Sequence, residues 1–353
     1  MYKNIQEAFV NNVLKIDFEG KEVESRGSKQ KEILSNFFQI EKPEHRVITV
    51  PHRNNNIFAT VAETIWVLSG RNDMKFLTKY LPRALEFSDD GLVWRGAYGP
   101  RLRDWNGVDQ FKTVLNRFRQ DIHTKRAVIS IYDPYLDSIE VTKDIPCNNW
   151  INFNVRENVL HMNVSVRAND AIWGFSGINS FEWSVLQQIF AYWLGCNIGN
   201  LSWFAGSFHV YERHYDLIKK IIFLKEIPNV YDLDIPTLTF CTPFIEFDKL
   251  LKECFEIEEM FFSDASVEDV LNVIRNIQDP LFNTFMLMLF EYHLLRNTSD
   301  IDKINKINAE IPCSDLKLAA LEYMIRNKVH IDRLSLNAHE REFLYQYQWI
   351  RGK

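Results

Sequence analysis

The chain has 353 residues, of which 46% are hydrophobic and 25% are charged, and this composition is ordinary for a soluble globular protein. Its length allows one large core, or a core with an attached domain. The formal net charge of −6 argues against a protein that coats nucleic acid, which would usually carry a basic stripe, so we expect no direct nucleic-acid binding.

The first part of the chain mixes helix and strand patterns. Apolar residues recur at helical spacing across 57–68, and the β-branched run at 127–132 predicts a short strand. Residues 159–167 alternate between apolar and polar side chains, which predicts a strand with one dry face and Arg167 at the end of its polar face. The apolar stretch at 181–194 predicts a buried helix. The content is therefore mixed α and β.

After about residue 245 the patterns become mostly helical. Asp279 followed by Pro280 is typical of a helix start. The apolar stretch at 281–295 is too short and too interrupted by polar residues to span a bilayer, so we expect no membrane segment. We predict that residues 247–353 form a mainly helical C-terminal extension.

Cysteine usage and the N-terminus indicate a location. The five cysteines are irregularly spaced, without a CxxC pair or a metal-ligand spacing, which favours a reduced compartment and no bound metal. The N-terminal residues lack the apolar core of a signal peptide. We therefore expect a cytoplasmic protein.

One cysteine, Cys147, has an informative context. It follows a polar loop that ends in Pro146, and a strand-like segment comes after it. A lone cysteine is more often buried and inert. Four other segments accompany this one along the chain: Tyr98-Gly99-Pro100-Arg101, Lys125-Arg126, Arg167-Ala168-Asn169-Asp170 and Gly206-Ser207-Phe208-His209-Val210-Tyr211. In this order, from about Arg26 to about Asp216, the set resembles the thymidylate synthase family.

The resemblance implies an α/β (α+β) core with a large mixed sheet flanked by helices, spanning residues 1–246, and a homodimer formed through the sheet. It also implies one-carbon transfer from 5,10-methylenetetrahydrofolate to C5 of a pyrimidine nucleoside 5′-monophosphate. In such a reaction the Cys147 thiolate adds to C6 and activates C5, which splits one hard step into two easier ones. A free thiol has a pKa of roughly 8.5, and Arg167 is expected to favour the thiolate. The other four cysteines are expected to be inert.

A nucleotide phosphate needs cations, and arginine suits it because its planar fork makes two hydrogen bonds at once. By resemblance these cations are Arg26 and Arg167, with Lys125 and Arg126 contributed by the other subunit of the dimer. Without the family, Lys125 and Arg126 would be interpreted as a solvated strand edge.

The resemblance also implies which residues contact the sugar and the base of the nucleotide. His209 and Tyr211 would hold the sugar 3′-hydroxyl, and Tyr98 would also line the substrate site. Asn179 would contact the base, where its amide can pair with O4 and N3–H of uracil, whereas cytosine-specific relatives tend to carry aspartate. The choices between uracil and cytosine, and between ribose and deoxyribose, remain open.

Two carboxylates complete the predicted site. Glu63 would orient water and move protons around C4 and C5, as general acid–base groups do. A glutamate in an apolar helix is costly to bury unpaired, and the alternative is that Glu63 lies on the wet side of its helix. Asp170 matches the aspartate that contacts the folate pterin.

Departures from the family pattern bear on the final step. Leu85 stands where the family has a tryptophan near the folate, Asn148 replaces a histidine and Asn152 a glutamine, and the short closing tail is absent. Hydride transfer needs a dry, closed site, so these changes favour water as the final nucleophile and predict hydroxymethylation. The alternatives are a divergent thymidylate synthase that makes dTMP, and, given Ala168 and Ser207, a nucleotide-binding homologue without catalysis.

Overall fold

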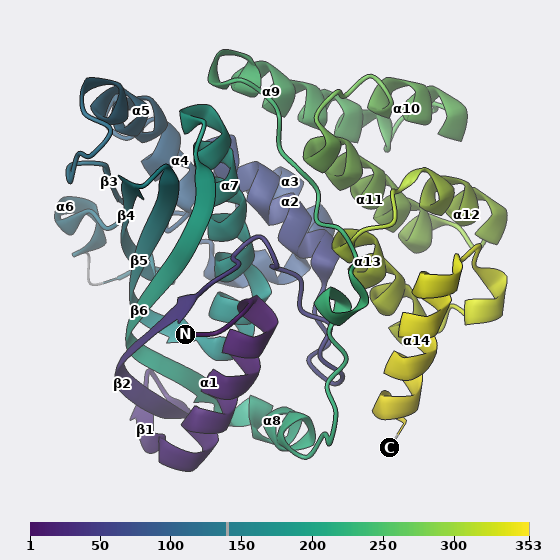
Figure 1. Ribbon diagram of the computed structural model, residues 1–353, viewed down its shortest axis with the longest axis horizontal. Coiled ribbons are helices and arrows are strands. Elements are labelled where there is room, and N and C mark those ends of the chain that lie inside the picture. Colours follow the sequence, from purple (N-terminus) through teal and green to yellow (C-terminus); the bar gives the residue numbers. More distant parts are fainter. Residues whose placement is uncertain (139–140, 353) are drawn as a thin grey trace. The chain divides into compact units, whose positions relative to one another are not determined.

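The computed structural model describes residues 1–138 and 141–352 (Figure 1). The chain forms two compact units, each built from two segments. The sheet unit comprises residues 1–46 and 63–222, and the helical unit comprises residues 47–62 and 223–353. The predicted division into a thymidylate synthase-like catalytic domain (1–246) and a mainly helical extension (247–353) stays a prediction.

The sheet unit contains a six-stranded sheet with the order β1-β2-β6-β5-β4-β3. Its strands are β1 (Lys21–Ser25), β2 (Ser28–Ile40), β3 (Val128–Ser130), β4 (Asn148–Arg156), β5 (Val159–Asp170) and β6 (Asn197–Tyr211). Neighbouring strands are antiparallel except β5 and β6, which are parallel. This confirms the predicted mixed sheet.

The dry face of the sheet follows from the alternation in β5. Leu160, Met162, Val164 and Val166 are buried, as the sequence pattern predicts. Two helices, α1 (Ile5–Glu19) and α7 (Ser180–Leu194), pack against the sheet (Figure 1). The crossover from β5 to β6 runs through a π-helical segment, η2 (Ala171–Asn179), and α7. The ends of β5, η2 and α7 therefore meet at one end of the sheet.

Shorter helices complete the sheet unit. They are α3 (Met74–Tyr80), α4 (Tyr98–Arg103), α5 (Gln110–Gln120), α6 (Pro134–Asp137) and α8 (Tyr215–Ile222), with a 3-10 helix, η1, at Pro82–Phe87. A further helix, α2 (Ile57–Leu68), has the predicted bounds, and its last six residues belong to the sheet unit.

In the helical unit, every helix of eight or more residues after 223 lies between 244 and 351. These helices are α9 (Phe244–Met260), α10 (Val267–Ile274), α11 (Pro280–Asn297), α12 (Ile301–Glu310), α13 (Asp315–Arg326) and α14 (Ala338–Arg351). The Asp279 side chain caps α11 as predicted, by accepting from the backbone N–H of Leu281 and of Phe282. Phe58 packs against Tyr292 and Tyr323, with ring centroids 5.1 Å away in both cases. Among the described residues, no helix is long and apolar enough to cross a membrane.

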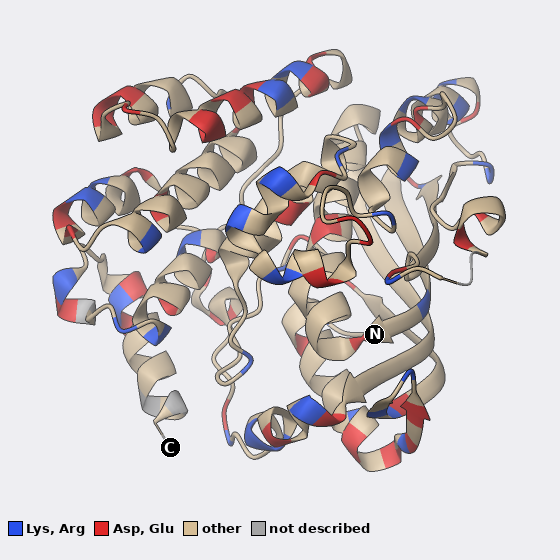
Figure 2. Cartoon of the chain, turned by 180° about the vertical axis from the view of Figure 1, so that it is seen from behind, with Lys and Arg blue, Asp and Glu red and all other residues tan. Residues whose placement is uncertain are grey.

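The other face of the sheet carries an exposed apolar row. Phe37 pairs with Phe204, Phe204 with Ser165, and Ser165 with Trp150 across four strands. Phe37, Phe204 and Trp150 are 59%, 41% and 42% exposed. Charged residues are sparse on the central strands, which are mostly tan in Figure 2. We call these four residues the sheet-face row.

Candidate active site

Cys147 lies directly before β4, and Arg167 of β5 lies beside it. The distance from Arg167 Nη2 to Cys147 Sγ is 3.8 Å. The guanidinium is fixed because Nε donates to the carbonyl of Pro146 at 3.0 Å and Nη2 donates to that of Ile145 at 2.7 Å. The backbone N–H of Arg167 also donates to the carbonyl of Cys147 at 2.9 Å. The pairing of the two strands thus brings together the thiol and the cation that the sequence predicts for it.

The pKa of the Cys147 thiol reflects opposing effects. The side chain is partly exposed, yet burial is the largest influence and raises its pKa to about 11. Arg167 and Arg26 lower the pKa by favouring the thiolate, whereas Asp144 and Asp170 raise it. At neutral pH the thiol form therefore dominates, and thiolate formation depends on the cations that oppose burial.

Arg26 reaches this site from the turn between β1 and β2. Arg26 and Gly27 have φ values of 51° and 72°, the left-handed conformations that a two-residue turn needs to match strand twist. Such a conformation is strained for arginine. From this turn, Arg26 Nη2 donates to the carbonyl of Lys143 at 3.3 Å, so the turn contacts the loop that leads to Cys147.

Lys125 and Arg126 lie elsewhere in the same unit. They are exposed and follow α5, where they line a hollow of about 340 Å³ with Arg117 and His123 among its other residues. Neither residue is among the main influences on the pKa of Cys147, which are burial, the two arginines and the two aspartates. One protomer therefore brings together two of the four predicted phosphate-binding residues.

Tyr98 and Asn148 form a hydrogen-bonded chain next to the cysteine. Asn148 is fully buried, and its Nδ2 donates to the Tyr98 hydroxyl at 2.7 Å while its Oδ1 accepts from Trp183 Nε1 at 3.0 Å. Burial, with Cys147 and Glu182 nearby, raises the pKa of Tyr98 well above its usual value. Tyr98 is therefore a neutral hydroxyl held beside the thiol.

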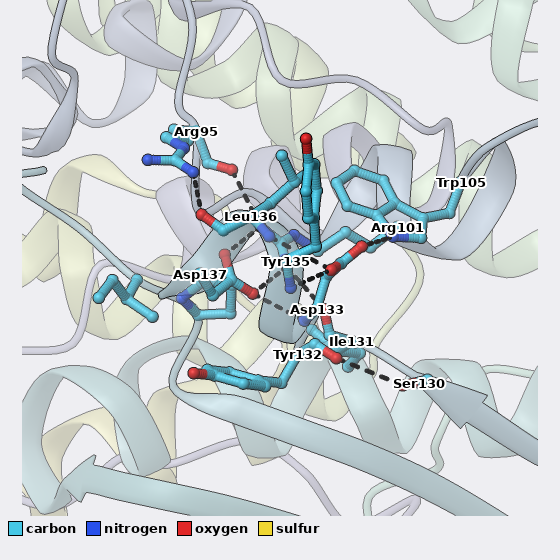
Figure 3. Close-up of polar contacts among 12 residues, drawn as sticks. Arg95, Arg101, Trp105, Ser130, Ile131, Tyr132, Asp133, Tyr135, Leu136 and Asp137 are labelled. Carbon is cyan, nitrogen blue, oxygen red and sulfur yellow. Dashed lines mark hydrogen bonds and ion pairs between the residues drawn. The ribbon is translucent and has the colours of Figure 1, made fainter. Parts of the chain in front are cut away.

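The helix that begins at Tyr98, α4, is held by a buried ion pair. Arg101 and Asp137 are joined by two hydrogen bonds, of 2.5 and 2.8 Å (Figure 3). The Arg101 guanidinium also donates to the carbonyl of Ile131 at 2.7 Å and lies 4.7 Å from the centre of the Trp105 ring. Because breaking a buried pair leaves an uncompensated charge, these contacts fix α4, and Tyr98 with it, against the segment after β3.

Glu63 lies in a buried carboxyl pair with Glu182 of α7. Glu63 is 8% exposed and Glu182 is 1% exposed. Glu63 therefore does not lie on the solvent-exposed side of its helix. Burial raises the pKa of Glu63 to about 8. Burial, with Glu63 as a neighbouring like charge, raises the pKa of Glu182 well above its usual range. The pair therefore holds at least one proton near neutral pH.

Asn179 is buried at the end of η2, and both ends of its amide already have a protein partner. Its Nδ2 donates to Glu182 Oε1 at 2.9 Å, and its Oδ1 accepts from Asn169 Nδ2 at 3.3 Å. The residue predicted to contact the base is thus oriented by two buried neighbours.

His209 and Tyr211 lie at the end of β6 with their rings 5.1 Å apart. Ser207 Oγ donates to Glu32 and lies 3.3 Å from His209 Nδ1. Burial lowers the pKa of His209, although the adjacent Asp170 raises it, so the imidazole is mainly neutral. Asp170 pairs with His209 across the parallel strands and caps η2 through Oδ1, which accepts from the backbone N–H of Ile172 at 2.9 Å.

Sequence reasoning missed three buried side chains of this site: Asn169, Glu182 and Trp183. Glu182 could have been found by the argument applied to Glu63, because it also interrupts an apolar helix. Asn169 and Trp183 carry no comparable signal, since an amide after a strand and a tryptophan in an apolar helix are ordinary. Their importance appears only when β5 and α7 are brought together.

The chain is similar to several known proteins. The family model described as thymidylate synthase matches residues 7–259. The chain is 31% identical over 340 residues to "Deoxyuridylate hydroxymethyltransferase" of Bacillus phage SP01, with 88% of each chain covered. It is 38% identical over 196 residues to the protein of that name from Delftia phage PhiW-14, covering 52% of this chain and 54% of the relative. The protein of that name from Pseudomonas phage M6 is 26% identical over 361 residues and covers 98% of each chain, so this similarity extends well beyond residue 259.

Proposed function

The chain belongs to the thymidylate synthase family, and we propose that it hydroxymethylates dUMP with a one-carbon unit from 5,10-methylenetetrahydrofolate. The observation that carries this proposal is the Arg167 guanidinium held 3.8 Å from the Cys147 sulfur, in a chain similar along nearly its whole length to deoxyuridylate hydroxymethyltransferases. We propose uracil as the base and deoxyribose as the sugar because the names of those relatives specify deoxyuridylate.

In the proposed reaction, the Cys147 thiolate attacks C6 of the base. The S–C6 bond forms as the C5=C6 electron pair moves to C5 and the C4 carbonyl, and C5 then bonds to the one-carbon unit. Loss of the C5 proton, with departure of tetrahydrofolate from the transferred carbon, would leave an exocyclic methylene. Water would then add to that methylene, and the S–C6 bond would break as the C5=C6 bond forms again, which releases the thiolate. Since burial raises the pKa of the thiol to about 11, we assign Arg167 the role of stabilising the thiolate.

Glu63 suits the proton transfers of this scheme. A carboxyl group whose pKa is about 8 can both donate and accept a proton near neutral pH, which general acid–base catalysis requires. We assign it the protons at C4 and C5. Tyr98, held by Asn148 at 2.7 Å, would line the same pocket beside the thiol.

For the nucleotide, we assign Asn179 to the base and His209 with Tyr211 to the sugar hydroxyl. Arg26 and Arg167 would bind the phosphate from the same subunit as the thiol. Lys125 and Arg126 would reach it from the partner of a homodimer, which agrees with their exposure away from Cys147 in one protomer.

The folate would supply the one-carbon unit, and the residues near Asp170 fit it. Asp170 uses Oδ1 to cap η2, which leaves Oδ2 as an acceptor for a pterin N–H. The half-exposed ring of Trp173 has the Arg83 guanidinium 5.3 Å from its centre, and a flat heterocycle with carboxylates could bind beside such a pair. The position where the family has a tryptophan holds Leu85, which is 47% exposed, so we assign the aromatic contact to Trp173.

The homodimer proposal rests on the sheet-face row. An exposed apolar row on a sheet usually marks an interface. Its three exposed apolar residues are Phe37, Phe204 and Trp150, and its fourth residue, Ser165, is uncharged, so a second copy of the chain could bury the row.

The test is a product assay by mass spectrometry. Purified protein would receive the folate with dUMP, dCMP, UMP and CMP in separate reactions, with Cys147→Ser as the control. We expect hydroxymethyl-dUMP and tetrahydrofolate from the wild type and no product from the variant. A methylated product with dihydrofolate would make the protein a thymidylate synthase instead, and no product from any nucleotide would favour a non-catalytic homologue.

A further inference from the structure

Four buried polar side chains form a connected cluster at the end of β5. Asn169, Asn179, Glu182 and Glu63 are 1%, 5%, 1% and 8% exposed. Hydrogen bonds join Asn169 to Asn179 and Asn179 to Glu182, and Glu63 is close enough to Glu182 to raise its pKa. We call these residues the acid–amide cluster.

The cluster contains more acceptors than it satisfies. Asn169 Oδ1, Glu182 Oε2 and Glu63 Oε2 are buried without a hydrogen-bond partner among the described residues. An unpaired buried polar atom costs about 1–3 kcal/mol, so such a group usually has a ligand, a proton or a water as its partner. Each of these three oxygens can therefore accept a hydrogen bond from a bound ligand, from water or from the proton that the two carboxyls hold.

Gly174 of η2 lies next to the two amides of the cluster. A Cβ at Gly174 would lie 2.5 Å from Asn169 Nδ2 and 3.5 Å from Asn179 Oδ1. The absence of a side chain at Gly174 therefore lets η2 pass close to the Asn169 amide, whereas the Asn179 amide lies at an ordinary contact distance.

The hydrogen bonds to Asn169 and Glu182 determine where the oxygen and the nitrogen of the Asn179 amide lie. If its Oδ1 and Nδ2 were exchanged, Nδ2 would face the Asn169 donor and Oδ1 would face the Glu182 acceptor. Both hydrogen bonds would then be lost. An amide has two N–H groups and two acceptor lone pairs, so the observed orientation leaves one donor and one acceptor in fixed positions.

That orientation matters because the pairing edges of uracil and cytosine are opposite in polarity. Uracil presents an acceptor at O4 and a donor at N3, whereas cytosine presents a donor at N4 and an acceptor at N3. An amide that fits one base must rotate by half a turn to fit the other. Whatever fixes the amide therefore selects the base.

We propose that Glu182 is a positioning residue for base selection: by accepting from Asn179 Nδ2, it holds the amide in the orientation that matches uracil and rejects cytosine. Asn169 supports the same orientation from the other end. This inference rests on the proposed function, in which Asn179 contacts the base. A proton shared with Glu63 does not disturb it, because a proton on Glu63 or on Glu182 Oε2 leaves Oε1 as an acceptor.

The test measures nucleotide binding without the folate. Isothermal titration would give Kd for dUMP and dCMP with the full-length wild type, Glu182→Gln and Asn169→Asp. In Glu182→Gln the new amide can accept or donate, so both orientations of Asn179 are satisfied. In Asn169→Asp an acceptor replaces the donor and favours the exchanged orientation. We expect the ratio Kd(dCMP)/Kd(dUMP) to fall by about tenfold or more in each variant.

A matched control separates this effect from a general loss of a buried acid. Glu291→Gln makes the same change at a fully buried glutamate on α11, and it should leave the ratio unchanged. If one cluster variant does not fold, as judged by its urea unfolding curve, the other still tests the inference.

The outcomes are distinguishable. An unchanged ratio in the folded variants, or equal weakening of both nucleotides, would mean that Glu182 is structural and would overturn the inference while dUMP hydroxymethylation stands. A wild type that prefers dCMP would overturn it directly. If the wild type binds neither nucleotide, the proposed function fails and the inference fails with it.

Discussion

At the scale of single residues, the central feature is the Cys147 thiol, because its burial opposes formation of the thiolate that the proposed reaction needs. Burial raises the pKa of Cys147 to about 11, and Arg167 is the strongest influence that lowers it. A nucleophilic cysteine normally sits in an electropositive setting that lowers its pKa. Here the cation is present but does not outweigh burial, so each change to it should be visible in the reactivity of the thiol.

We expect Arg167→Gln to slow alkylation of Cys147 by iodoacetamide between pH 8 and 10. Only the thiolate reacts, and removing the cation raises the pKa further, so the rate falls by about tenfold for each unit of increase. In the wild type the rate should rise with pH up to about 11. Peptide mapping by mass spectrometry would separate Cys147 from the other four cysteines.

Arg26→Gln serves as the control for this measurement, because Arg26 lowers the pKa of the thiol less than Arg167 does. Its effect on the rate should be smaller than that of Arg167→Gln. Equal rates in the wild type and in Arg167→Gln would contradict the assigned role of Arg167.

The residue scale also shows how far sequence reasoning reaches. The cysteine and the arginine of the strand end were predictable because their order along the chain matches a family, and the structure places them 3.8 Å apart. The partners of Asn179 were not predictable, because Asn169 and Glu182 become neighbours only through the π-helical segment that joins β5 to α7.

At the scale of elements, strong periodicity predicted well and short strands did not. The helix at 57–68 has the predicted bounds, and the apolar stretch at 181–194 became α7. The run at 127–132 yielded a strand of only three residues, Val128–Ser130. That strand lies at the sheet edge and pairs only with β4, so its length depends on a partner that its own sequence does not reveal.

In the helical unit, α11 carries a buried carboxyl group among mostly apolar residues. Glu291 is fully buried, and neither carboxyl oxygen has a hydrogen-bond partner among the described residues. Burial raises its pKa to about 8, and Lys317 opposes the increase. Lys317 itself is paired with Glu340 at 3.0 Å. Glu291 therefore stays protonated in the folded protein at pH values where an unfolded chain would have released its proton.

We expect Glu291→Gln to gain stability relative to the wild type as the pH rises. The folded-state pKa lies above the unfolded value of about 4.5, so the contribution of the protonated carboxyl is complete below pH 4.5 and is lost by about pH 8. Glutamine cannot ionise. The difference in unfolding free energy, variant minus wild type, should increase by a few kcal/mol between pH 5 and pH 8.5, measured by urea unfolding. An equal difference at both pH values would show that Glu291 does not titrate in this range.

At the scale of the whole molecule, the proposed dimer has a direct test. We expect Phe204→Arg to convert the protein to a monomer in analytical ultracentrifugation, because a charge would replace the centre of the sheet-face row. Ile245→Arg is the control, since Ile245 is 86% exposed on α9 and should leave the dimer intact. A wild type that sediments as a monomer at micromolar concentration would rule out the proposal.

The whole chain was also harder to predict than its parts. The sequence indicates a change of character near residue 245, and by packing the helical unit begins at residue 223 and also includes residues 47–62. The composition of residues 47–62 does not reveal that they belong to the helical unit, because their apolar residues would suit either core. Their place in that unit is recognisable only from the packing of Phe58 against Tyr292 and Tyr323.

The assignment of residues 47–62 to the helical unit has a consequence for the order of folding during synthesis. The ribosome delivers Phe58 234 residues before Tyr292, which at roughly 5–20 residues per second is a delay of roughly ten to fifty seconds. Both segments of the sheet unit are complete by residue 222, so that unit can close while residues 47–62 still wait for their partners. During synthesis, the apolar side chains of residues 47–62 therefore stay exposed after the sheet unit is complete. We expect chaperones to bind this segment first.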